Sequence, residues 1–303
     1  MSRLFACSVL AAFAATALLP ARAQTAAPDP AAILAAARSA SGPAPPAQNL
    51  EVSGAFRMQP QGGGRQMQGE LVLRFLAPRR YQRSLSMRLP FGQIRTIQTL
   101  DGDTVWMHVQ HPAFGGRFGA FRRGARQVTA AQREQLRQRM QARQKRLLLA
   151  QWARGELEFF LQPPPGATLR YAGLAKAPNG VTADMIAVSD SAWGADGGPV
   201  TLFLDTRSHR LLMMSYQGIA PFEFSRARFV PPGGRPGRFA GGRPPRPKPR
   251  TVFVHFTHWR KIQGHWFPME ITRSANGKTF AEWDVKTVRW NSRKLTARVF
   301  QKP

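Results

Sequence analysis

Glu282 and Asp284 are the two acidic side chains whose spacing best suits catalysis. They stand two residues apart in a run that alternates apolar and polar residues, so a strand would place both carboxylates on one face. A pair of carboxylates on one face is an arrangement that acid–base catalysis uses. The chain, however, holds 44 Lys and Arg against 16 Asp and Glu. We therefore interpret the two acids as ion-pair partners of Arg or Lys.

Histidines are the next candidates for metal or proton chemistry. His255 and His258 are three residues apart on an apparent strand, and this odd spacing sends their side chains to opposite faces. His265 could approach either of them through a turn. The sequence has no Gly-x-Ser-x-Gly elbow, no His-Glu-x-x-His and no P-loop. We expect no enzymatic activity, no metal site and no cofactor.

Positive charge dominates the chain, whose formal net charge is +28. One concentration is a predicted helix over 129–155, in which Glu134 is the one acid; another is the segment 231–250, with seven Pro, five Gly and six Arg or Lys. We expect these segments to meet an anionic membrane surface or lipid headgroups. The candidate residues are Arg133, Arg137, Arg139, Arg143, Lys145, Arg146, Arg235, Arg238, Arg243, Arg246, Lys248 and Arg250.

Simpler interpretations of both segments stay open. The helix could present a solvated basic face while the apolar stripe of Leu136, Met140, Leu147, Leu148 and Trp152 packs on the protein. The Pro/Arg/Gly loop, which cannot bury a core and is predicted to be disordered, could be inert. Its composition also resembles nucleic-acid-binding tails, but we do not expect nucleic acid to be a partner of an exported protein.

The first 23 residues have the three parts of a secretory signal peptide. Arg3 supplies the positive charge, Leu4 to Leu19 are almost wholly apolar, and Ala21 and Ala23 are small residues before the expected cleavage site. Leu4 to Cys7 resemble a lipobox, but the apolar segment follows the cysteine instead of preceding it. We therefore expect a cleaved signal and a periplasmic protein that, without Cys7, has no thiol.

Two helices interrupt a pattern that is otherwise typical of strands. Asp29 is the expected N-cap of a short helix over 31–41, with Pro30 at its first position and Gly42 after its end. Thr129 and Gln132 form a predicted capping box, and Gly155 is the expected stop of the long basic helix.

Alternation with a period of two runs through most of the chain after Asn49. Leu50, Val52, Phe56 and Met58 alternate with polar residues, and similar runs follow at short intervals. Asp101-Gly102, Asn179-Gly180 and Asn276-Gly277 mark hairpin turns between such runs. We predict about a dozen strands in one large antiparallel sheet.

Several local patterns resemble the LolA/LolB-like superfamily of outer-membrane lipoprotein carriers, the lipoprotein-sorting proteins. They are Gly54-Ala55-Phe56, Gly69 to Pro78, Leu100 to Trp106, Leu202 to Asp205, Gly264 to Pro268, Trp290-Asn291 and Phe300 to Pro303. The resemblance implies a mainly β fold, a curved antiparallel half-barrel with an N-terminal helix and one long inserted helix. We divide the chain into the signal peptide (1–23), an Ala/Pro-rich segment with a short helix (24–48) and a single β domain (49–303). This domain contains a basic helical insertion at about 111–156 and the loop 231–250.

The resemblance also implies a function. It is that of a soluble envelope carrier or binder of a lipid or a lipoprotein acyl group, held in a hydrophobic cavity without covalent chemistry and exchanged with an envelope donor or acceptor protein. The alternative is an envelope sensor or scaffold that binds a protein, an anionic polymer or a lipid surface through its basic helix and loop. Alternation does not separate a ligand cavity from an ordinary core. The candidates for the cavity are Phe56, Leu73, Phe75, Leu85, Met87, Trp106 and Trp152.

Overall fold

The computed structural model describes residues 27–42, 48–59, 66–89, 92–110, 129–177, 180–190, 198–218 and 249–302. Its helical elements are α1 (Pro30–Ser41), α2 (Ala130–Gly155), the π-helix η2 (Glu156–Phe160) and the 3-10 helix η4 (Ala297–Phe300). The strands are β1 (Asn49–Met58), β2 (Met67–Leu76), β3 (Arg80–Leu89), β4 (Gly92–Asp101), β5 (Thr104–Gln110), β6 (Thr168–Lys176), β7 (Thr182–Ser189), β8 (Val200–Asp205), β9 (Leu211–Gly218), β10 (Arg250–Ile262), β11 (His265–Ala275) and β12 (Lys278–Trp290). The predicted signal peptide and most of the predicted disordered loop lie outside the described residues.

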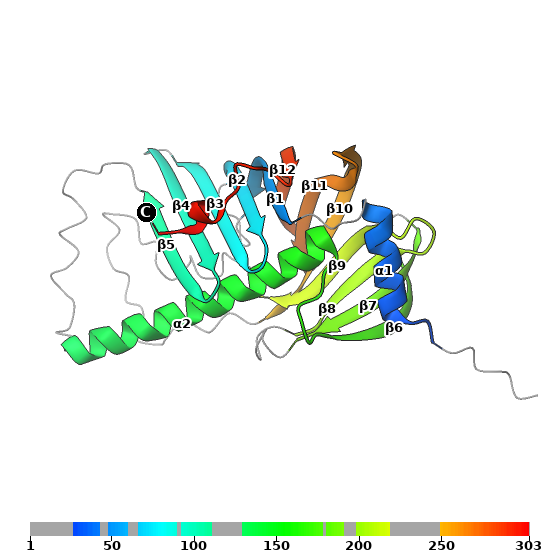
Figure 1. The fold of residues 1–303 in the computed structure, drawn as a ribbon, viewed down its shortest axis with the longest axis horizontal. Coiled ribbons are helices and arrows are strands. Elements are labelled where there is room, and N and C mark those ends of the chain that lie inside the picture. Colours follow the sequence, from blue (N-terminus) through cyan, green and yellow to red (C-terminus); the bar gives the residue numbers. More distant parts are fainter. Residues whose placement is uncertain are drawn as a thin grey trace, which may run out of the picture.

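All 12 strands form one antiparallel sheet in the order β5-β4-β3-β2-β1-β12-β11-β10-β9-β8-β7-β6. Every neighbour in this order is adjacent in sequence except β1 and β12, which join the two arms of the sheet. Figure 1 shows the sheet bending between these arms, with α1 and α2 on the same side of it. The structure therefore confirms the predicted mainly β half-barrel with an N-terminal helix and one long inserted helix.

Strand alternation gives the sheet a concave and a convex face. In β1 and β2, residues Leu50, Val52, Leu73 and Phe75 lie on one face, and each is paired with another member of this set across the two strands. The cluster that these side chains form also contains Leu34 of α1 and other buried side chains of α2 and η2. The main core therefore lies between the concave face and the helices.

Both predicted helix starts are confirmed. Asp29 accepts a hydrogen bond from the amide of Ala31 at 3.0 Å, and Thr129 and Gln132 make the two reciprocal bonds of a capping box. Gly155 ends α2, but the prediction that it is a helix stop was wrong in its reason. The chain continues directly into η2, and a Cβ on Gly155 would lie 2.4 Å from Cζ of Phe75. Glycine is needed here because the helix approaches the sheet closely.

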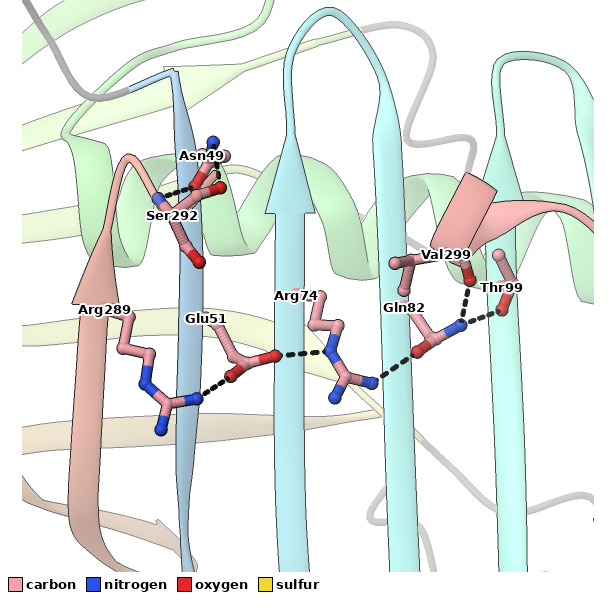
Figure 2. Close-up of polar contacts among 8 residues, drawn as sticks. All are labelled: Asn49, Glu51, Arg74, Gln82, Thr99, Arg289, Ser292 and Val299. Carbon is pink, nitrogen blue, oxygen red and sulfur yellow. Dashed lines mark hydrogen bonds and ion pairs between the residues drawn. The ribbon is translucent and has the colours of Figure 1, made fainter. Parts of the chain in front are cut away.

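The convex face carries a polar ladder across β12, β1, β2 and β3 (Figure 2). Glu51 accepts hydrogen bonds from Arg289 at 2.8 Å and from Arg74 at 2.7 Å, and Arg74 donates to Gln82 at 2.7 Å. Burial alone would raise the pKa of Glu51, but the hydrogen bonds and charges of Arg74 and Arg289 outweigh it and lower this pKa. The ladder therefore ties the two arms together at their junction.

The C-terminal segment packs on the same convex face. Gln82 donates to the carbonyl of Val299 at 3.0 Å and to the hydroxyl of Thr99 at 3.2 Å (Figure 2). The indole N–H of Trp106 donates to the carbonyl of Phe300 at 2.9 Å, and the Phe300 side chain is buried. These bonds hold η4 against β3, β4 and β5.

Candidate functional site

Five of the seven cavity candidates share the concave face. Pairing between β1, β2 and β3 places Phe56, Leu73, Phe75, Leu85 and Met87 on this face, where the first four are buried and Met87 is half-buried. They therefore line one continuous apolar surface. Trp152 of α2 is half-buried and packs against the core cluster from the helix side.

Trp106 does not belong to this surface. In β5 it pairs with Thr99, which in turn lies opposite Gln82 on the convex face. Its indole is bonded to the C-terminal segment. Val105 and Trp106 are neighbouring apolar residues, so the alternation of residue types does not show which of them faces inward. The register of the strand pairing decides this. Val105 and Met107 are the neighbours that face the concave side.

The concave face around β1, β2, β11 and β12 is filled by the aromatic side chains of η2. Phe159 stacks on Phe267 with 5.5 Å between ring centroids, and Phe160 meets the edge of Trp290 at 5.6 Å. Both rings also contact Phe75, at 5.7 and 5.8 Å. This part of the half-barrel is therefore occupied by the protein's own side chains.

The outer strands of the β1–β5 arm are covered less completely. Met87, Ile94, Met107 and Val109 continue the concave face across β3, β4 and β5, and we call these four residues the β3–β5 strip. Met107 is 52% exposed, and the other three are half-buried. Helix α2 contacts these three strands, yet it leaves the strip partly accessible.

A polar cluster lies under η2 on the concave side. Glu158 accepts hydrogen bonds from one nitrogen of Arg273 at 3.2 and 3.3 Å, and the Arg154 guanidinium lies 4.5 Å from the ring centroid of Tyr216. Burial raises the pKa of Glu158, although the charges of Arg273 and Arg154 act the other way. Burial also raises the pKa of Tyr81 nearby to about 12. One carboxylate thus fastens η2 to β11.

A second set of polar contacts positions α2 at the turn between β4 and β5. Lys145 lies 3.1 Å from the Asp103 carboxylate, whose pKa it lowers by hydrogen bonding and charge. The Arg79 guanidinium lies 5.7 Å from the ring centroid of Trp152. Burial raises the pKa of Glu156 to about 7, against a hydrogen bond from Trp152 that favours the carboxylate.

The anionic-surface candidates separate into three groups. Arg133, Arg137, Arg139, Arg143 and Arg146 are exposed on α2, whereas Lys145 faces the sheet and pairs with Asp103, so we remove it from the set. Arg250, the last residue of the predicted loop 231–250, begins β10, and its backbone pairs with Gly218. The remaining five, Arg235, Arg238, Arg243, Arg246 and Lys248, lie outside the described residues.

The residues first considered for catalysis have structural partners. Glu282 and Asp284 both pair with Arg57, as predicted. The His258 imidazole lies 2.6 Å from Glu270, which the sequence interpretation did not foresee. Among the residues that the structure describes, no group of three His, Cys, Asp or Glu side chains is placed to hold a metal ion. In the same described part, no helix combines the length and apolarity needed to cross a membrane.

The sequence interpretation missed η2 altogether. Glu158, Phe159 and Phe160 fill and fasten the concave side, but their segment Glu-Leu-Glu-Phe-Phe is too short to show a period. Two signals were available. The segment places two acids directly after a strongly basic helix, and it contains an adjacent pair of large aromatic residues.

No protein-family model matches the chain, and the search of curated proteins returns no match. Among solved structures, a DUF1329 family protein from Desulfovibrio piger is similar at 10% identity, with 90% of this chain and 98% of that chain covered and a TM-score of 0.48. A LolA superfamily protein from Nitrosomonas europaea has 9% identity, with 91% and 99% covered and a TM-score of 0.47. A domain from Vibrio parahaemolyticus, described as an outer membrane lipoprotein-sorting protein domain, has 8% identity, with 89% and 94% covered and a TM-score of 0.47. The second and third descriptions name the family that the sequence resembles, and no residue role is transferred from them.

Proposed function

We propose that the protein is a periplasmic carrier or binder of a lipid or an acyl group, which it holds on its concave face without covalent chemistry. The observation that carries this proposal is the β3–β5 strip, where Met107 is 52% exposed although it lies on the face that forms the core elsewhere. Methionine side chains adapt to apolar ligands of different shape. The strip contains two of them.

The cargo would lie between the β3–β5 strip and the sheet-facing side of α2. Burying each methylene of an acyl chain is favourable by about 0.8 kcal/mol, so a chain of a dozen carbons needs no specific polar contact to be held. Carriage of longer chains would require η2 to move, since its aromatic rings occupy the concave face at β2 and β11.

Titration with a fluorescent C16 fatty acid tests this assignment. The double variant Met87→Gln/Met107→Gln makes the strip polar, and we expect it to bind the probe about tenfold more weakly than the unmodified chain. Leu174→Gln is the matched control, because Leu174 is 60% exposed but lies on β6 at the far edge of the sheet. The control should bind as the unmodified chain does.

Native mass spectrometry of the chain purified from its own envelope provides a second measurement. We expect adducts with the masses of lipids or acyl groups. A spectrum of free chain only, together with no saturable binding of the fatty acid, would rule out carriage.

The second candidate is a scaffold that binds a protein, an anionic polymer or a lipid surface and carries no cargo. The filled concave face under η2 favours it, because Phe159 and Phe160 leave this surface no exposed apolar residue such as Met107. The mass spectrum and the titration separate the two candidates.

A further inference from the structure

Helix α2 has two apolar stripes, and only one of them packs on the sheet. Leu148 is buried and Trp152 is half-buried. Lys145, one turn before Leu148, lies on the same side of the helix and pairs with Asp103. A surface helix needs one such stripe to attach to its protein. The attachment of α2 is therefore complete without the second stripe.

The second stripe faces away from the sheet. Leu136, Met140 and Leu147 follow one another at spacings of four and seven residues, which place them on one face of a helix. They are 56%, 62% and 48% exposed. These three are the majority of the large exposed apolar side chains in the described part of the chain, so their grouping on one helix face marks an interaction surface.

Arginines surround this stripe. Arg143 lies on the same face, three residues after Met140 and four before Leu147, and the other arginines flank the stripe. Glu134, which pairs with Arg137, is the one acid of the helix. We call the whole surface the outward face of α2; its members are Arg133, Leu136, Arg137, Arg139, Met140, Arg143, Arg146 and Leu147.

The outward face is also placed where a flat partner can reach it. The helix has 26 residues and is therefore about 39 Å long. Figure 1 shows its N-terminal part extending past β5, the edge strand of the sheet. All side chains from Ala130 to Arg143 are exposed, so no described element covers them.

We propose that the outward face of α2 docks on the surface of an anionic phospholipid bilayer. The arginines complement the phosphate and anionic headgroups, and the apolar stripe enters the boundary between headgroups and acyl chains. A soluble polyanion would satisfy the arginines but leave Leu136, Met140 and Leu147 in water. The apolar stripe therefore favours a membrane over a polymer.

This docking deepens the proposed function, because it would bring the β3–β5 strip and α2 to the source of a lipid cargo. Its test measures vesicle binding without any cargo, so either proposal can fail while the other holds. The full chain is sedimented with vesicles of phosphatidylcholine alone and with vesicles that contain 30% phosphatidylglycerol. We expect binding to the anionic vesicles only.

Two variants divide the outward face into its components. Arg137→Gln/Arg139→Gln/Arg146→Gln should weaken binding to the anionic vesicles about 100-fold, because each of the three lost cations removes about a fivefold share of the affinity for an anionic surface. Leu136→Gln/Met140→Gln/Leu147→Gln should weaken it about tenfold or more, although it leaves the charge unchanged. Circular dichroism and thermal melting confirm that each variant is folded.

Two control variants carry substitutions of the same kinds elsewhere in the chain. Arg260→Gln/Lys278→Gln/Arg293→Gln removes three exposed cations from strands and a turn, and Leu174→Gln removes an exposed apolar side chain. Both should bind the anionic vesicles as the unmodified chain does.

Two results would overturn the proposal. One is equal loss in the arginine variant and its control, which would mean that net charge alone attracts the protein. The other is unchanged vesicle binding in the leucine–methionine variant together with equally tight binding to a soluble polyphosphate, which would identify a polymer as the partner.

Discussion

Charged side chains in this protein respond to their surroundings in opposite ways. Glu51 lies between Arg74 and Arg289, and these partners lower its pKa. At Glu156 burial outweighs a hydrogen bond from Trp152, so its pKa rises to about 7. Acidification therefore removes a stabilising contribution at Glu51 as the pH falls through its lowered pKa, and it relieves a destabilising one at Glu156.

Glu156 gives a prediction for stability against pH. Its folded-state pKa of about 7 lies above its ordinary value of 4.5, so the folded protein binds more protons between these values. Stability should fall as the pH rises from about 4.5 through 7. Glu156→Gln should remove this dependence and stabilise the protein at pH 8 by about 1–3 kcal/mol. Urea unfolding at pH 5 and pH 8 measures both effects.

Glu134→Gln is the control for this prediction, because Glu134 is an exposed acid on the preceding helix. It should leave the pH dependence of unfolding unchanged. An identical pH dependence in the unmodified chain and Glu156→Gln would contradict the assignment.

At the scale of elements, the sequence predicts those features that a repeated local pattern produces. The alternation of Leu50, Val52 and Phe56 predicts β1, and the Thr129–Gln132 capping box predicts the start of α2. The sequence cannot predict which apolar residues of α2 pack against the sheet. Leu147 and Leu148 are the same residue type at neighbouring positions, and only the position of the sheet decides which of them is buried. For the same reason Trp106 was assigned to the wrong face. The π-helix η2 has no period to detect.

The ion pair between Glu158 of η2 and Arg273 of β11 gives a prediction about the attachment of these elements. A buried pair depends on both members, and removal of one leaves an uncompensated charge. Arg273→Met should destabilise the protein by about 3–5 kcal/mol at pH 8. Because burial raises the pKa of Glu158, this loss should become smaller as the pH is lowered, since protonation removes the uncompensated charge.

The double variant Glu158→Leu/Arg273→Met should recover most of the stability, since two apolar side chains remove both charges. Arg57→Met provides the comparison on the surface. Arg57 pairs with Glu282 and Asp284 while it is 44% exposed, so its loss should cost less than about 1 kcal/mol. Denaturant unfolding of the unmodified chain and of these three variants measures the free energies of unfolding that the comparison needs. A double variant that is no more stable than Arg273→Met would contradict the expected recovery.

At the scale of the molecule, one curved sheet is covered unequally along its concave face. Its β1, β2, β11 and β12 part is closed by η2, whereas the β3–β5 strip stays partly exposed. The curvature and strand number follow from the sequence patterns and their resemblance to a known family. The division into a closed and an exposed part does not, because it depends on which side chains of η2 meet the sheet and not on alternation.

This division leads to a last prediction. Phe159→Ala should remove the ring that stacks on Phe267 and leave space beside the β1–β2 surface. The variant should lose about 3 kcal/mol of stability. It should also bind the fluorescent C16 fatty acid several-fold more tightly, because an apolar space beside the β1–β2 surface stays dry and accepts an apolar ligand. Calorimetry and the fatty-acid titration measure the two effects.

Phe203→Ala is the matched control, because Phe203 is a buried aromatic residue of the separate cluster that also contains Ala183 and Met213. Its pairing with Met213 and Met185 places it on the face opposite Leu202, whose side chain belongs to the main core. The space left there lies on the convex face, so this variant should lose stability without a gain in fatty-acid affinity. Equal affinities of Phe159→Ala and the unmodified chain would mean that cargo never reaches the surface under η2. The β3–β5 strip would then be the whole binding surface, and the aromatic side chains of η2 would serve only the stability of the half-barrel.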